Sequence, residues 1–308
     1  MKSLVVTFLA IIVLYGVVYL FAWGSLHFYQ KSKKGRRSPL SHKLLRAPGQ
    51  TLSGQVEDIT EELNGDLAML FILPFSLLSL CLAQVHWGLL KPTVVNVGLY
   101  TLIGLAAMIF IARRLNHRLK TRNSLRLGLE AEMAAGQELN HLMLHGCHVF
   151  HDFPAEEFNI DHVVVGPSGV LAVETKGRPK PDKGRGAIDA KVIYDGEALH
   201  FPDWNETKPL QQAKRQAVWL SKWLSSAIGE FITVKPALAL PGWFVERTKA
   251  GDVIVFNGRS PQFLAKPGRE GQLSPEIIQR ISHQLEQRCR DVEPVAYRKE
   301  KKKQAGAK

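Results

Sequence analysis

The sequence predicts an α/β domain, in which helices flank a mixed β-sheet, preceded by three transmembrane helices. Two observations lead to this prediction. Three long apolar runs without a formal charge lie within residues 1–112, and short apolar runs bounded by turns alternate with helical patterns in the remainder of the chain. Strands and helices that alternate along a sequence are typical of an α/β fold.

The apolar runs cover residues 4–23, 67–90 and 94–112. Each is about long enough to cross a hydrocarbon core of roughly 30 Å. A signal peptide is the alternative for the first run, but the run is longer than a usual signal-peptide core and no small-x-small cleavage site follows it. A soluble core helix is the alternative for the other two, which lie back to back with only residues 91–93 between them. We therefore expect three membrane helices.

Basic residues predict how these helices are oriented. They follow the first run within 31–37 and the third within 113–126, whereas the loop between the second and third runs carries only Lys91. Lysine and arginine near membrane ends are retained on the cytoplasmic side. The prediction is a multi-pass protein of the cell (inner) membrane with its N-terminus outside, and with residues 24–66 and everything after 112 in the cytoplasm.

Periodicity and turn residues divide the chain further. The expected parts are a first transmembrane helix (1–30), a cytoplasmic linker (31–66) with a short surface helix at 55–63, a transmembrane hairpin (67–112), a basic juxtamembrane linker (113–123), an α/β domain (124–260), and a C-terminal helix with a basic tail (261–308). Strands are expected at 147–150, 160–176, 192–201, 234–240 and 252–256, and helices at 125–144, 209–226 and 274–290. Ser274 is expected to cap the last helix, with Pro275 at its first position.

The stretch 160–176, IDHVVVGPSGVLAVETK, predicts a hairpin whose far end carries charge. If Pro167 and Ser168 are the loop residues, Asp161 faces Glu174 across the two strands. Lys176 then leaves the sheet on the same face as Glu174. Two acids at such a short distance repel each other, and burial raises their pKa values further. The arrangement is therefore costly unless a cation neutralises the two charges.

Two interpretations of this charged end remain open. Mg²⁺ suits the first, because it takes oxygen ligands from one or two carboxylates and completes its shell with water and substrate phosphate. The Lys176 ammonium would then stabilise charge on a scissile phosphate or hold the attacking water. In the second, the end of the hairpin is an ion-paired rim, where Lys176 simply neutralises one acid.

At these residues the sequence resembles the nuclease-related domain called NERD, of the PD-(D/E)XK nuclease superfamily, over about residues 124–260. In that family Gly-Glu on a first helix is followed by Ile-Asp-His, a short hairpin with glycine, Glu-x-Lys, and Pro-x-x-Gln at the start of a later helix. The same order appears here as Ala131-Glu132, Ile160-Asp161-His162, Pro167-Ser168-Gly169, Glu174-Thr175-Lys176 and Pro209-Leu210-Gln211-Gln212.

The resemblance implies a restriction-endonuclease-like sheet. It also implies that Asp161 and Glu174 bind Mg²⁺ or Mn²⁺, that Lys176 assists the hydrolytic water, and that Glu132 and Gln212 complete the site. Three positions depart from the family pattern: Ala131 stands where glycine is usual, Gly177 where asparagine or an aromatic residue is common, and Lys208 where asparagine is usual. None of them removes a carboxylate, so they bear on substrate preference more than on chemistry.

A basic loop follows the Glu-x-Lys strand. Its residues are Arg178, Lys180, Lys183, Arg185 and Lys191. The formal net charge of the chain is +12, but part of it belongs to the membrane flanks. Because this loop adjoins Lys176, we expect it to contact the phosphates of a nucleic acid. The alternative is a disordered basic loop without a ligand.

Histidines and cysteines give weaker signals. His141, His145, Cys147, His148 and His151 lie close together in sequence, but their spacing fits no usual structural zinc site. Surface or core histidines beside a strand are expected instead. The three cysteines are scattered and form no disulfide framework, which suits a reducing cytoplasm.

Together these features predict a membrane-anchored, Mg²⁺-dependent nuclease that hydrolyses phosphodiester bonds of DNA, or of RNA, with a metal-activated water as nucleophile. A catalytically inactive nucleic-acid-binding module and a membrane scaffold that binds a protein partner are the alternatives. The intact set Asp161, Glu174 and Lys176 favours the enzyme, because a protein without catalysis has no need to keep acids crowded together.

The orientation can be tested with reporter fusions. At Asn116, a reporter that works in the cytoplasm should be active and a reporter that works only after export should be inactive. The reason is that the basic cluster after residue 112 is retained on the cytoplasmic side. The same reporter fused at Lys91 should behave as an exported one. Export of the Asn116 fusion would contradict the orientation.

Overall fold

The computed structural model describes residues 17, 19–25, 27–28, 39–89, 93–266 and 272–294. The first predicted transmembrane run, residues 4–23, lies mostly outside the described residues. The chain divides into two compact units, one formed by Met1–Leu44 with Asp291–Lys308, and the other by Leu45–Arg290. In the first unit Leu44 and Val292 form an isolated antiparallel bridge. All the elements below belong to the second unit.

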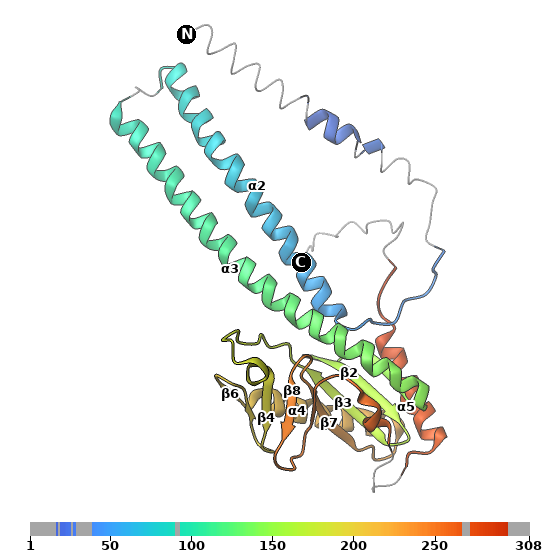
Figure 1. Cartoon of the computed structure of the whole chain (residues 1–308). Helices are drawn as coiled ribbons and strands as arrows, with labels where there is room; N and C mark the ends of the chain where they lie inside the picture. The colour runs from blue at the N-terminus through green and yellow to red at the C-terminus, as the bar shows by residue number, and fades with distance from the viewer. Residues whose placement is uncertain are drawn as a thin grey trace. The chain divides into compact units, whose positions relative to one another are not determined.

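Two long helices, α2 (Gln50–His86) and α3 (Val94–Asn140), pack against each other (Figure 1). In the described part of the chain these are the two helices long and apolar enough to cross a membrane, and no residue of their apolar stretches is buried. The described residues therefore hold two such helices before the sheet domain, not the three predicted. Length and composition alone support membrane association only weakly.

Both helices are longer than predicted. α2 includes the surface helix expected at 55–63, and α3 continues without a break through the basic segment 113–123. No proline interrupts α3, and the basic segment is rich in arginine, leucine and lysine, which are good helix formers. A short 3₁₀ helix, η1 (His141–His145), follows α3. The segment that follows the third apolar run is therefore helical and connects that run directly to the sheet domain.

An ion-pair cluster joins the two helices beside the apolar stretches. The Asp66 carboxylate is only 6% exposed and lies 2.5 Å from Arg118 Nη1 and 3.2 Å from Arg114 Nε. Arg118 Nη2 also pairs with Glu62 Oε2 at 2.9 Å. A buried carboxylate needs such partners, because an uncompensated buried charge is strongly destabilising. The cluster therefore fixes α2 against α3.

The main sheet is mixed, as predicted. Its strands are β1 (His148–Pro154), β2 (Asn159–Gly166), β3 (Gly169–Thr175), β7 (Val234–Ala239) and β9 (Ile254–Phe256), in this order. β1, β2 and β3 pair antiparallel, whereas β3, β7 and β9 pair parallel. The predicted hairpin register is confirmed for Val165 with Val170 and for Val163 with Ala172, and the ladder ends at His162 and Val173.

A second sheet was not predicted. It contains β6 (Asn205–Glu206), β5 (Leu199–His200), β4 (Lys191–Tyr194) and β8 (Phe244–Arg247), in this order. The single strand predicted at 192–201 is in fact two strands, β4 and β5. The Asp195 carboxylate accepts backbone N–H groups of Glu197 and Ala198 at 2.9 and 2.7 Å, and Gly196 has φ +95°, so the chain turns back at this point.

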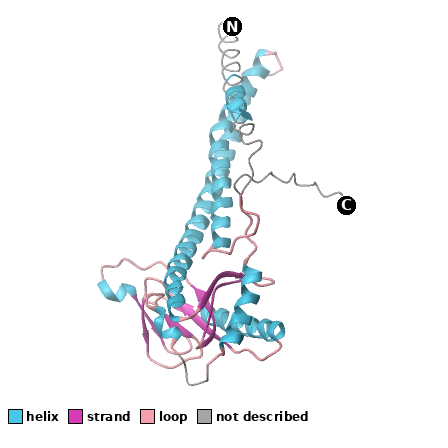
Figure 2. Ribbon diagram, turned by 90° about the vertical axis from the view of Figure 1, so that its right-hand side faces the viewer, coloured by secondary structure: helices cyan, strands magenta, loops and turns pink. Residues whose placement is uncertain are grey.

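Helices cover both faces of the main sheet (Figure 2). On one face Val163, Val165 and Val170 pack with α4 (Lys208–Ile228) and α5 (Pro275–Cys289). On the other face Val164 and Leu171 pack with the C-terminal part of α3. Alternate residues of β2 and β3 thus face opposite layers. The predicted cap of the last helix is confirmed, since Ser274 Oγ accepts the Ile277 N–H at 3.3 Å.

Candidate functional site

The far ends of β2 and β3 bring Asp161, Glu174 and Lys176 together. Glu174 is 1% exposed, and its Oε1 forms an ion pair with the Lys176 ammonium. Asp161 is partly buried, and its Oδ2 accepts the backbone N–H of Thr175 at 2.6 Å. The Lys176 N–H donates to Ala239 O of β7 at 3.0 Å, so the neighbouring parallel strand fixes this end of the hairpin.

Glu132 joins this group from α3. It is 9% exposed, and Glu174, Lys176 and Asp152 all lie near enough to act on its charge. Gly177 explains the close approach of α3, because a Cβ at this position would lie 2.6 Å from Leu127 O and 3.1 Å from Ala131 Cβ. Ala131 and Gly177, which both depart from the family pattern, therefore face each other. Any side chain at position 177 would collide with Leu127 and Ala131, so the glycine allows α3 to lie this close.

A glutamine of α4 that was not predicted, Gln216, also joins the group. Gln216 is 2% exposed and donates from Nε2 to Glu174 Oε2 at 2.6 Å and to Asn159 O at 3.2 Å. Its Oε1 has no hydrogen-bond partner among the described residues. Gln212 lies one turn earlier and is partly buried. The signal for Gln216 was its spacing of four residues from Gln212, which places both on one side of the helix.

Burial and neighbouring charges shift the pKa values of Glu132 and Asp161. Burial, Asp152 and Glu174 raise the pKa of Glu132 to about 7, although Lys176 acts in the opposite direction. Burial, Glu174 and Glu132 hold the pKa of Asp161 well above its usual range, against the Thr175 N–H and Lys176. The cluster therefore holds more negative potential than Lys176 offsets, and a further cation would relieve it.

The donors of this cluster fit a hard cation. Asp161 and Glu174 offer carboxylate oxygens, and the unpartnered Gln216 Oε1 is a third oxygen. Mg²⁺ and Mn²⁺ prefer such ligands. Within the described ranges, however, no group of three or more His, Cys, Asp and Glu side chains lies in metal-binding geometry. The acidic ligands that this site can supply are then the two carboxylates of Asp161 and Glu174. The ion pair of Glu174 with Lys176 is the interaction expected if the end of the hairpin is an ion-paired rim.

Comparison with known families assigns this part of the chain. Residues 127–241 match the family model of the nuclease-related domain, NERD. The predicted resemblance is thus confirmed, and the match includes Glu132, Asp161, Glu174, Lys176 and both glutamines of α4. No curated protein and no solved structure matches the chain.

Within the region that matches the family model, acids hold the basic loop. Arg178 Nε lies 3.0 Å from Glu206 Oε1, Lys183 Nζ lies 2.9 Å from Asp203 Oδ1, and Arg185 Nη2 lies 2.5 Å from Asp189 Oδ1. Lys191 pairs with Glu246. Among the described residues Lys180 is the basic side chain of this loop that makes no ion pair. An exposed pair such as Lys183 with Asp203 contributes about 0–1 kcal/mol, so a phosphate can compete for it, whereas Asp189 is only 7% exposed.

The histidines near β1 form a neutral pair rather than a zinc site. His151 Nδ1 lies 2.9 Å from His162 Nδ1, and His151 Nε2 lies 3.0 Å from Asn140 Oδ1. Burial lowers the pKa of His151 to about 4, and burial together with His151 holds the pKa of His162 well below its usual range. His141, His145 and His148 are exposed. The pair links the end of α3 to β1 and β2 behind the carboxylates.

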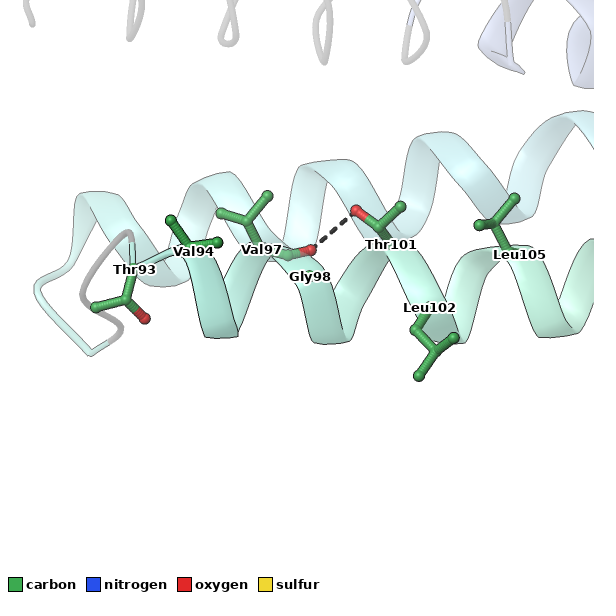
Figure 3. Close-up of a pocket in the computed structure, with 7 residues that line it drawn as sticks. All are labelled: Thr93, Val94, Val97, Gly98, Thr101, Leu102 and Leu105. Atoms are coloured by element: carbon green, nitrogen blue, oxygen red, sulfur yellow. Dashed lines mark hydrogen bonds between the residues drawn. The ribbon is translucent and has the colours of Figure 1, made fainter.

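A hollow lies in the apolar part of α3, far along the chain from Glu132. It is a groove of about 550 Å³ lined by Thr93, Val94, Val97, Gly98, Thr101, Leu102 and Leu105 (Figure 3). The Thr101 hydroxyl donates to Val97 O of its own helix at 2.9 Å. Its lining carries no titratable side chain, so the groove offers none of the chemistry found at the carboxylates.

The raised pKa of Glu132 predicts a pH-dependent stability in chelator. Between about pH 4.5, where an unfolded glutamate ionises, and about pH 7, the folded protein holds a proton that the unfolded chain has released. The free energy of unfolding should therefore fall as the pH rises through this window. Glu132→Gln should make the fall shallower, as measured by thermal unfolding of the full chain in detergent. Glu130→Gln, on the exposed side of the same helix, is the control and should keep the parent slope. Equal slopes for all three proteins would contradict the prediction.

Proposed function

We propose that this chain is a membrane-anchored, Mg²⁺- or Mn²⁺-dependent nuclease that hydrolyses phosphodiester bonds of DNA, or of RNA, in the cytoplasm. The observation that carries the proposal is the cluster of Asp161, Glu174 and Glu132 beside Lys176, inside the region that matches the nuclease-related domain. The mixed sheet with helices on both faces supports the restriction-endonuclease-like arrangement. The apolar stretches of α2 and α3 support the anchor.

Each residue has a separate task in this proposal. Asp161 and Glu174 hold the divalent ion, and Gln216 orients Glu174 through its Nε2–H. When bound, the ion polarises a phosphate oxygen and lowers the pKa of water. Lys176 positions the attacking water and stabilises the charge that grows on the phosphate. Because the Lys176 side chain is 24% exposed, its ammonium can turn from Glu174 toward a substrate.

The basic loop supplies affinity for the phosphate backbone. Lys180 is the free cation of the loop among the described residues, and in this proposal Arg178, Lys183 and Arg185 exchange their ion pairs with acids for contacts with phosphate. Such contacts are independent of sequence and release counterions. Parallel assays with labelled single- and double-stranded DNA and RNA distinguish the substrates.

A nucleic-acid-binding module without turnover is the second candidate. The observation in its favour is the ion pair between Lys176 and Glu174, which gives the buried carboxylate a cation without any metal. A binding module and a nuclease differ in their response to divalent ions, so the metal experiment below separates them.

Variants of the two acids and of the lysine should separate metal binding from hydrolysis. Asp161→Asn and Glu174→Gln each remove an anionic ligand with little change of shape, so Mn²⁺ affinity and cleavage should fall together. Lys176→Ala should keep or strengthen Mn²⁺ binding, because it removes a nearby positive charge. Its cleavage should fall by about 100-fold or more, as for the loss of a group that stabilises transition-state charge.

Calorimetric titration of Mn²⁺ and cleavage of a labelled duplex, both with the full chain in detergent, measure these effects. Glu157→Gln, an exposed acid between β1 and β2, is the matched control. If Asp161→Asn and Glu174→Gln both bind Mn²⁺ as the parent does, the acids are a structural rim and the nuclease proposal fails.

Salt dependence tests the loop. Lys180→Ala should reduce the slope of log affinity against log salt by about 1, the expected effect of losing one phosphate contact. Adding Arg178→Ala, Lys183→Ala and Arg185→Ala should flatten the slope further. Lys214→Ala, which removes an exposed lysine outside the loop, is the control. An unchanged slope in the fourfold variant would exclude the loop from binding.

A further inference from the structure

The segment 46–51, which leads into α2, lies against the carboxylate cluster. Gly49 has φ +69°, and a Cβ at this position would lie 2.5 Å from Leu129 Cδ1 and 3.7 Å from Glu132 Oε2. Pro48 lies on the next turn of α3, where a Cβ at Gly136 would come within 2.6 Å of Pro48 Cγ. The segment therefore packs on α3 beside Glu132, with no space for larger side chains at either glycine.

The Asp152 carboxylate of β1 holds this segment in place. It is 3% exposed, and its residue has φ +47°, an uncommon conformation for a non-glycine residue. Its Oδ2 accepts the Thr51 hydroxyl at 2.6 Å, the Thr51 N–H at 2.9 Å and Arg46 Nη1 at 2.9 Å. A buried carboxylate with three donors is fixed, and so is the segment that supplies them.

Asn159 continues these contacts to the centre of the site. Its Nδ2 donates to Asp152 Oδ1 at 3.0 Å and to Thr51 Oγ1 at 2.7 Å. Its carbonyl oxygen accepts Gln216 Nε2 at 3.2 Å, and the same Nε2 donates to Glu174 Oε2 at 2.6 Å. An unbroken series of hydrogen bonds therefore runs from the start of α2 to the buried Glu174.

We propose that the segment 46–51 is a wall of the carboxylate site, and that Thr51 is a positioning residue that orients Glu174 through Asp152, Asn159 and Gln216. The segment lies outside residues 127–241, the part of the chain that matches the nuclease-related domain. The first turn of α2 and the residues just before it thus complete the site, and a change in the position of α2 reaches Glu174. The effect on metal binding rests on the proposed function, whereas the effect on the local order of the site does not.

The test compares two threonines of α2 in the full chain in detergent. Thr51→Val keeps the β-branched shape and removes the hydroxyl that accepts from Asn159 Nδ2 and donates to Asp152 Oδ2, while the direct bond of Asn159 to Asp152 remains. Thr60→Val is the matched control, because the Thr60 hydroxyl donates only to Val56 O of its own helix. Thr51→Ser restores a hydroxyl and should restore parent behaviour. The readouts are the Mn²⁺ dissociation constant from calorimetry, and amide hydrogen exchange at residues 174–177 and 213–217 in chelator.

We expect Thr51→Val to weaken Mn²⁺ binding by about 10-fold or more, the usual effect of losing a group that supports a ligand. Exchange at both stretches should also become faster in this variant, and in Thr60→Val neither quantity should change. If Thr51→Val matches Thr60→Val in exchange and in Mn²⁺ affinity, the inference is wrong while the nuclease proposal stands. If the parent binds no Mn²⁺ and cleaves no nucleic acid, the proposed function fails. The exchange comparison then decides by itself whether segment 46–51 orders the site.

Discussion

The structure of the site depends on keeping carboxylates buried close together. Glu174 is almost fully buried, and burial together with the Glu174 charge raises the pKa values of both Asp161 and Glu132. Each layer of the fold contributes to offsetting this repulsion: β3 supplies the Thr175 N–H and leads to Lys176, β7 fixes Lys176 through its backbone, and α4 supplies Gln216. A metal ion would act on charges that the fold already holds in place.

The parts of the fold that follow from local rules could be predicted from the sequence. The hairpin register follows from the Pro167–Ser168 turn and the alternation of valines, and the start of α5 follows from its serine cap. The second sheet could not be predicted, because β4 pairs with β8 across a long stretch of chain and β6 has only two residues. Two-residue strands carry no periodic signal.

The candidate site shows the same division. The hairpin register and the alternation of side chains along its strands place Asp161, Glu174 and Lys176 together, so their proximity could be predicted from their spacing in the sequence. Gln216 depends on how α4 lies on the sheet, and Arg46 meets Asp152 across 106 residues of sequence, which no local pattern records. The basic loop is a further case, since its cations are visible in the sequence but their partners Asp203, Glu206 and Glu246 follow far later. A count of positive charges therefore overstates the charge available to phosphate.

α3 gives the site its connection to the apolar helices. The end of the third apolar run at residue 112 and Glu132 lie on one uninterrupted helix, about 30 Å apart at 1.5 Å per residue. The contacts of Gly177 with Leu127 and of Gly136 with Pro48 leave no space for α3 to slide on the sheet or on segment 46–51. Asp66 and Arg118 prevent α2 from moving alone. One continuous helix and a series of close contacts therefore connect the apolar stretches to Glu132 and the other carboxylates.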